Sequence, residues 1–255
     1  MDTNGVVAID LGTVFSRVAV WQDGDVVLIP NERGRTSTPS YVAFTQTATL
    51  VGDAAREQVE SNLANTIVAP QRFLGYKIGH PWIQWYMRSN PSQVARGENG
   101  KPVIQVVHEG KELRLCPEDL VAILLKRLRM QAERFLGRQV VDVVMAVPAG
   151  YGKVQREAIA CACHQAGLQV RDMVKTPTAA AIARCFRNLE REPRNIVVCD
   201  IGGTYYNYAL IRVEDGTFVE RAIGCLTCVS VCGCSRRRST NSNAAGLSRV
   251  GFFAC

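Results

Sequence analysis

VAIDLGTVF at residues 7–15 returns later in the chain as VVCDIGGTY at residues 197–205. Each copy contains a short apolar strand, an aspartate, one apolar residue and a glycine. A second apolar stretch follows each copy, at residues 16–21 and 209–213, and an Asp-Gly pair comes after it. The turn between the two strands is expected at Leu11-Gly12-Thr13 in the first copy, and the Asp-Gly pair is a further hairpin signal. The repeat therefore predicts two β-hairpins that place Asp10 and Asp200 at equivalent positions.

The repeated aspartate and glycine suit the binding of a polyphosphate. A glycine in the turn lets backbone N–H groups approach a phosphate, because no Cβ is in the way. An aspartate at the strand end can hold hydrated Mg²⁺, which prefers one or two carboxylates together with phosphate and water. Two such hairpins facing each other would clamp a polyphosphate from both sides, unlike a P-loop, in which the glycines lead from a strand into a helix. A single Asp-x-Gly is a common turn, so this hypothesis depends on the repetition.

Helix and strand patterns alternate along the rest of the chain. The clearest helix is predicted at residues 117–136, where Pro117 suits the first helical position and apolar side chains recur at helical spacing. Two more helices are predicted at 154–166 and 178–188, and two more buried strands at 140–147 and 195–199. Strands that alternate with helices predict an α/β fold.

The composition is ordinary for a soluble globular protein, with 47% hydrophobic and 21% charged residues. No apolar run reaches the ~20 residues of a membrane helix, and no basic region precedes the first apolar run. We therefore expect a cytoplasmic protein without a membrane partner. The net charge is +7, but residues 225–255 contribute four arginines and no acidic residue. The body of the chain gives little reason to expect nucleic acid as a partner.

Several further motifs occur in a fixed order: PNERGRTSTPSYVAF at residues 30–44, VGDAA at 51–55, VPA at 147–149 and PTAAAIA at 177–183. Together with AIDLGT at residues 8–13, which resembles the family's first phosphate motif, they resemble the N-terminal nucleotide-binding domain of the seventy-kilodalton heat-shock chaperones over about residues 5–224. The resemblance implies the actin-like ATPase fold, with two ribonuclease H-like lobes and nucleotide in the cleft between them. Lobe one would be complete over residues 1–189, with an insert subdomain at about 40–115. Lobe two would start at residues 190–224 and be truncated.

The resemblance also implies roles for individual residues. The cofactor would be ATP or ADP with magnesium, its binding weakened or lost. Asp10 and Asp200 would be the catalytic carboxylates, holding the magnesium ion through water. The residues that line the phosphates would be Gly12, Thr13, Val14, Gly202, Gly203 and Thr204.

Several family positions are substituted in this chain. Gln71 stands where the family has a catalytic lysine, Thr176 where it has a glutamate, and Asn207 where it has a second-lobe aspartate. An uncharged amide cannot supply the positive charge that stabilises phosphoryl transfer. The resemblance places a first phosphate loop at residues 12–15 and a second at residues 202–205. Their substituted positions are Val14, Phe15, Thr204 and Tyr205. Together these changes predict impaired or absent ATP hydrolysis.

Residues 225–255 form a cysteine- and arginine-rich tail without resemblance to the family. Neither helical nor strand periodicity persists there, so we expect disorder. The tail offers four thiols that could hold zinc, but their spacing is not that of two Cys-x2-Cys knuckles, and zinc is not favoured. These thiols belong to Cys225, Cys228, Cys232 and Cys234.

The sequence therefore favours a divergent heat-shock chaperone nucleotide-binding domain that binds ATP, hydrolyses it poorly or not at all, and assists protein folding. One alternative is a non-enzymatic interaction module for J-domain co-chaperones, nucleotide-exchange factors or full-length family members. Another is an inactive truncated product. Gln71, Thr176 and Asn207 favour the interaction module over a working enzyme, and the short second lobe favours the inactive product.

Overall fold

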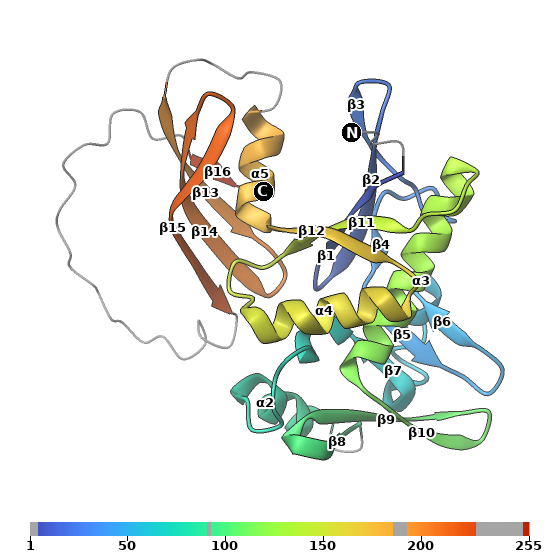
Figure 1. Ribbon diagram of the computed structural model, residues 1–255. Coiled ribbons are helices and arrows are strands. Elements are labelled where there is room, and N and C mark those ends of the chain that lie inside the picture. The colour runs from blue at the N-terminus through green and yellow to red at the C-terminus, as the bar shows by residue number, and fades with distance from the viewer. Residues whose placement is uncertain (1–4, 91–92, 186–192, 228–251, 255) are drawn as a thin grey trace. The chain divides into compact units, whose positions relative to one another are not determined.

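The computed structural model describes residues 5–90, 93–185, 193–227 and 252–254 (Figure 1). The chain forms two compact units. Unit one comprises Met1–Met145 and Gly152–Met173, and unit two comprises Ala146–Tyr151 and Val174–Cys255. This division follows contacts within the chain, so the family-based lobe boundary at residue 190 stays a prediction.

The main sheet of unit one contains the first of the two hairpins. Its strand order is β12-β11-β1-β2-β3, and β4 also pairs with β2. The strands are β1 (Val7–Leu11), β2 (Phe15–Gln22), β3 (Asp25–Leu28), β4 (Thr38–Pro39), β11 (Asp142–Val147) and β12 (Gln169–Lys175). Strands β1 and β2 are antiparallel, as the repeat predicts. The apolar residues of β1 alternate into the core, with Val7 and Ile9 each 1% exposed.

Helices α3 (Pro117–Leu136) and α4 (Lys153–Gln165) pack against each other in the same unit (Figure 1). Both ends of α3 follow from the sequence. Pro117 occupies the first helical turn, and the Asp119 carboxylate accepts a hydrogen bond from the Cys116 backbone N–H at 2.8 Å. Gly137 ends the helix in the left-handed conformation, with φ of 65°. The predicted bounds of α3 are confirmed.

Short elements fill residues 41–115, where the insert subdomain is expected. One small sheet has the order β6-β5-β7, and a second has the order β10-β9-β8. Their strands are β5 (Tyr41–Phe44), β6 (Thr49–Val51), β7 (Thr66–Val68), β8 (Val94–Arg96), β9 (Pro102–His108) and β10 (Lys111–Leu115). The helices of the region are α1 (Asp53–Arg56), α2 (Pro81–Ser89) and the 3₁₀ turns η1 (Leu63–Asn65), η2 (Pro70–Phe73) and η3 (Glu98–Gly100).

Unit two contains the second hairpin in a sheet of order β15-β14-β13-β16. Its strands are β13 (Arg194–Ile201), β14 (Tyr205–Glu214), β15 (Thr217–Thr227) and β16 (Phe252–Ala254). Helix α5 (Thr176–Cys185) packs on β13 and β14. Their shared apolar core is Ala181, Cys185, Ile196, Val198, Ala209, Ile211 and Val213. Helix α5 begins two residues before the predicted start, and residues 186–188 of the prediction lie outside the described part of the chain.

Strand β15 extends beyond residue 224, where the sequence led us to expect the resemblance to end. Residues 225–227 continue the strand, with Cys225 opposite Asn207 of β14. Residues 252–254 pair in parallel with β13. These two short segments are therefore in strands, whereas residues 228–251 and 255 of the expected disordered tail lie outside the described residues.

Candidate functional site

The first hairpin places Asp10 next to an arginine. Asp10 is on β1 and lies directly opposite Arg17 on β2 in the antiparallel register. The Arg17 Nη1 atom is 3.6 Å from Asp10 Oδ2, and the two side chains are 47% and 42% exposed. Sequence reasoning did not identify Arg17. The spacing could have revealed it, because the residue seven places after the aspartate faces that aspartate in both hairpins.

Gly12 forms the turn of this hairpin, and its carbonyl oxygen accepts two side-chain hydrogen bonds. The Ser40 hydroxyl donates at 2.6 Å and the Gln71 amide donates at 2.5 Å. A Cβ on Gly12 would lie 2.4 Å from the Phe15 carbonyl oxygen, so only glycine fits this turn without a shift of the backbone. Of the two following residues, Thr13 is buried and Val14 is 44% exposed.

Gln71, at the position of the expected lysine, is in the buried turn η2 and is 1% exposed. Its amide reaches Gly12 across 59 positions of sequence. The side chain therefore supports the backbone of the first phosphate loop. A neutral amide performs this role without the cost of burying a charge.

The second hairpin surrounds Asp200 with uncharged donors. Asp200 Oδ2 accepts a hydrogen bond from the Thr176 hydroxyl at 2.5 Å and another from the Asn207 amide at 2.9 Å. Asn207 is directly opposite Asp200 in the register, and its own Oδ1 accepts from the Ala149 backbone N–H at 3.0 Å. Thr176 and Asn207 are the two positions in this unit where the resemblance implies acidic residues. Both now donate to the same carboxylate oxygen.

The second phosphate loop is closed by its own backbone. The Gly202 N–H donates to the Tyr205 carbonyl oxygen at 2.9 Å. Gly202 and Gly203 are exposed, whereas Thr204 is 5% exposed. The role of these residues at a phosphate stays a prediction.

The structure thus brings together the candidate residues of each unit separately. Asp10, Gly12 and Gln71 share unit one, and Thr176, Asp200 and Asn207 share unit two. The expectation that the two hairpins face each other across a cleft stays a prediction. Within residues 5–90, 93–185 and 193–227, no group of three His, Cys, Asp or Glu residues could hold a metal ion. Of the four cysteines considered for zinc, only Cys225 falls in these ranges.

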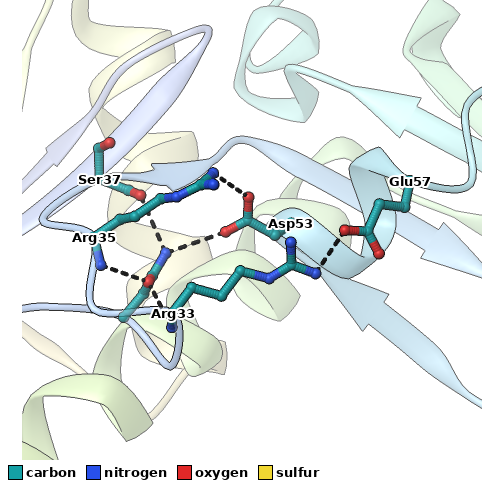
Figure 2. A network of polar contacts seen from close by, with 6 residues as sticks. Arg33, Arg35, Ser37, Asp53 and Glu57 are labelled. Carbon is teal, nitrogen blue, oxygen red and sulfur yellow. Dashed lines mark hydrogen bonds and ion pairs between the residues drawn. The ribbon is translucent and has the colours of Figure 1, made fainter.

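A second polar cluster lies in unit one, around a hollow of about 600 Å³. Figure 2 shows Arg35 directed at Asp53 and Arg33 directed at Glu57, with ion-pair distances of 3.1 and 2.6 Å. Asn31 joins the cluster because its amide donates to Asp53 at 3.3 Å. The arginines and carboxylates pair with one another, so this cluster ties the loop at residues 31–37 to α1.

Comparison with known proteins identifies a family. The family model described as Hsp70 protein matches residues 6–227. Heat shock 70 kDa proteins of Ajellomyces capsulatus and Neurospora crassa are 39% and 40% identical over 212 residues, which is 83% of this chain and 30% and 33% of theirs. A heat shock cognate HSP70 protein of Trypanosoma brucei brucei is 39% identical over 223 residues, covering 87% of this chain and 33% of its own length. The chain therefore spans about a third of the length of these relatives.

No helix in the described part of the chain is long and apolar enough to cross a membrane. The repeated hairpins, the α/β sheets and the family match over residues 6–227 agree with one another. The resemblance inferred from the sequence is confirmed, and the chain belongs to the Hsp70 family, whose nucleotide-binding domain has the actin-like ATPase fold.

Proposed function

We propose that this chain is a divergent Hsp70 nucleotide-binding domain that binds ATP or ADP, hydrolyses ATP little or not at all, and assists protein folding. The observation that carries the proposal is the pair of hydrogen bonds from Thr176 and Asn207 to one oxygen of Asp200. Two positions at which the family resemblance implies acidic residues are occupied here by neutral donors. The second hairpin keeps the Asp200 carboxylate where the resemblance implies an acidic cluster.

The first hairpin supports the same conclusion. Gln71 carries no charge with which to stabilise a transferring phosphoryl group, and its amide is engaged by the carbonyl oxygen of Gly12. Loss of one preorganised contact to a transition state typically costs about a hundredfold in rate. The substituted positions act as a unit, so their separate losses do not simply add.

Magnesium fits these residues poorly. Mg²⁺ is held in proteins by one or two carboxylates together with water and phosphate oxygens. One oxygen of Asp200 already accepts two hydrogen bonds. The Arg17 guanidinium lies 3.6 Å from Asp10, where its positive charge opposes the approach of a second cation. The residues present therefore support binding of nucleotide phosphates better than magnesium-dependent hydrolysis.

Two measurements on the purified chain test this proposal. Equilibrium titration with a fluorescent ATP analogue should show saturable binding that unlabelled ADP displaces. Steady-state phosphate release should stay close to background with magnesium and a J-domain partner present. Asp10→Asn is the matched control, because it removes the charge of the first-hairpin carboxylate and keeps its size. Robust turnover that disappears in Asp10→Asn would overturn the proposed loss of hydrolysis, and absence of nucleotide binding would overturn the proposed binding.

A second candidate function is a non-enzymatic interaction module. The same neutral substitutions favour it, because a chain that retains the family fold but not the acidic site can still present the family's surface. J-domain co-chaperones, nucleotide-exchange factors and full-length family members are the proposed partners. Binding of a purified J-domain protein that is unchanged in Asp10→Asn would support this candidate. Binding of the J-domain protein that requires nucleotide would favour the nucleotide-binding function proposed first.

A further inference from the structure

We propose that Arg17 supplies the positive charge at the first phosphate loop, so that this chain binds nucleotide phosphates without a divalent cation. The inference rests on the proposed nucleotide binding and specifies how that site meets the ligand's charge. It concerns the hairpin of β1 and β2 in unit one.

Hairpin geometry places Arg17 beside the phosphate loop. Arg17 faces Asp10 across the antiparallel ladder, and Asp10 is two residues before Gly12, at the turn. In the second hairpin the equivalent cross-strand position is Asn207, which donates to Asp200. Both hairpins therefore place a polar partner for their aspartate at the same position, a hydrogen-bond donor in the second and an ion-pair partner in the first. In the first hairpin that partner, Arg17, carries a full positive charge.

The contact with Asp10 leaves Arg17 able to take a phosphate. The two side chains are about half exposed, and the 3.6 Å between Nη1 and Oδ2 is longer than a charge-assisted hydrogen bond. Exposed ion pairs of this kind are weak, because water screens them. A guanidinium presents a planar set of donors that matches two oxygens of a phosphate. Exchange of the carboxylate for a phosphate should therefore be favourable.

The same arrangement makes Asp10 a poor ligand for a divalent cation. A cation that approached the carboxylate would meet the charge of Arg17 at close range, and like charges at such distances repel. In unit two, the carboxylate of Asp200 is supplied with hydrogen bonds by Thr176 and Asn207. Asp200 is therefore supplied with donors without a metal ion.

The experiment measures binding to the full chain by isothermal titration calorimetry. ATP and inorganic tripolyphosphate are titrated separately, each once in EDTA and once in magnesium. The dissociation constant for ATP in EDTA should lie within about threefold of that in magnesium. Arg17→Gln should weaken binding in EDTA by on the order of tenfold, the usual effect of losing a charge-assisted contact. Arg17→Lys keeps the charge without the planar donors, so its affinity in EDTA should lie between those of the parent chain and Arg17→Gln.

Arg212→Gln is the matched control. Arg212 is on the second hairpin, in an ion pair with Glu214 at 2.9 Å, and its loss lowers the net charge by the same amount. It should leave the affinity in EDTA unchanged, which separates a local contact from general attraction by a basic protein. Urea denaturation of each variant should match the parent chain, because both ion pairs are partly exposed.

The outcomes separate this inference from the proposed function. If ATP binds in magnesium but not in EDTA, Arg17 does not replace the cation, and nucleotide binding still stands. Binding in EDTA that is equal in the parent chain and Arg17→Gln would likewise overturn the role of Arg17. Absence of binding in both conditions would overturn nucleotide binding and this inference together.

Discussion

Asn207→Asp should strongly destabilise the protein at neutral pH. The substitution replaces an amide that donates to Asp200 at 2.9 Å with a second carboxylate at a position that is 5% exposed. Two unit charges at this distance repel by about 6 kcal/mol at an effective dielectric constant of about 20. The pair can avoid this repulsion by taking up one proton. Holding a carboxyl of ordinary pKa protonated at pH 7 costs about 4 kcal/mol. This cost is the upper limit on the stability that the substitution can remove through charge repulsion.

The shared proton also forms a new hydrogen bond, which offsets about 1 kcal/mol. We therefore expect the free energy of unfolding to fall by roughly 3 kcal/mol at pH 7, measured by urea denaturation. The pKa of the carboxyl pair is raised above its unfolded value, so the native state binds the extra proton below that raised pKa. The penalty should accordingly shrink as the pH falls, by about 2.7 kcal/mol between pH 7 and pH 5.

Asn195→Asp is the control for this experiment. Asn195 is on the same strand β13, is half-buried and faces Arg212, so a new carboxylate there meets an arginine. Its effect should stay within about 0.5 kcal/mol. If Asn207→Asp lost less than about 1 kcal/mol at pH 7, or if its penalty did not change with pH, the two side chains would not be coupled as described.

Three further predictions concern other parts of the chain. Gly12→Ala should lower the free energy of unfolding by about 2 kcal/mol in urea, because its Cβ would lie 2.4 Å from a carbonyl oxygen, whereas Gly79→Ala, with no atom within 4 Å, should have little effect. Gln71→Leu removes one of two donors to the Gly12 carbonyl and should cost about 1 kcal/mol in the same assay; an unchanged midpoint would contradict its supporting role. Burial raises the pKa of Cys163 to about 12, so at pH 8 iodoacetamide should modify the exposed Cys161 and spare Cys163 in the native protein; peptide mass spectrometry showing equal labelling would refute this.

Local signals made the helices and hairpins predictable. Pro117 and Gly137 mark the two ends of α3, because the conformations they favour suit the start and end of a helix. The glycine turns and apolar strands of the repeat predicted both hairpins, and each Asp-Gly pair marked the next turn, to β3 and to β15. The start of α5 was predicted two residues late, because Thr176 was considered only as a substituted family position. In the structure it begins the helix and donates to Asp200.

The candidate site was only partly predictable. Asp10, Asp200 and the glycines followed from the repeat and from the family resemblance. The support of Gly12 by Ser40 and Gln71 depends on residues 28 and 59 positions away, which no local pattern brings together. The positions of Arg17 and Asn207 opposite their aspartates were predictable in principle, because the strand register fixes them once the hairpins are known.

The path of the backbone between the two units limits how this protein can be dissected. The chain leaves unit one after Met145, returns to it at Gly152 and leaves it again after Met173. Neither unit is therefore one continuous stretch of polypeptide. Expression of residues 174–255 alone would omit Ala146–Tyr151, and with it the Ala149 N–H that donates to Asn207. A gene fragment that encodes unit two needs residues 146–151 joined through a designed linker, or supplied as a second peptide.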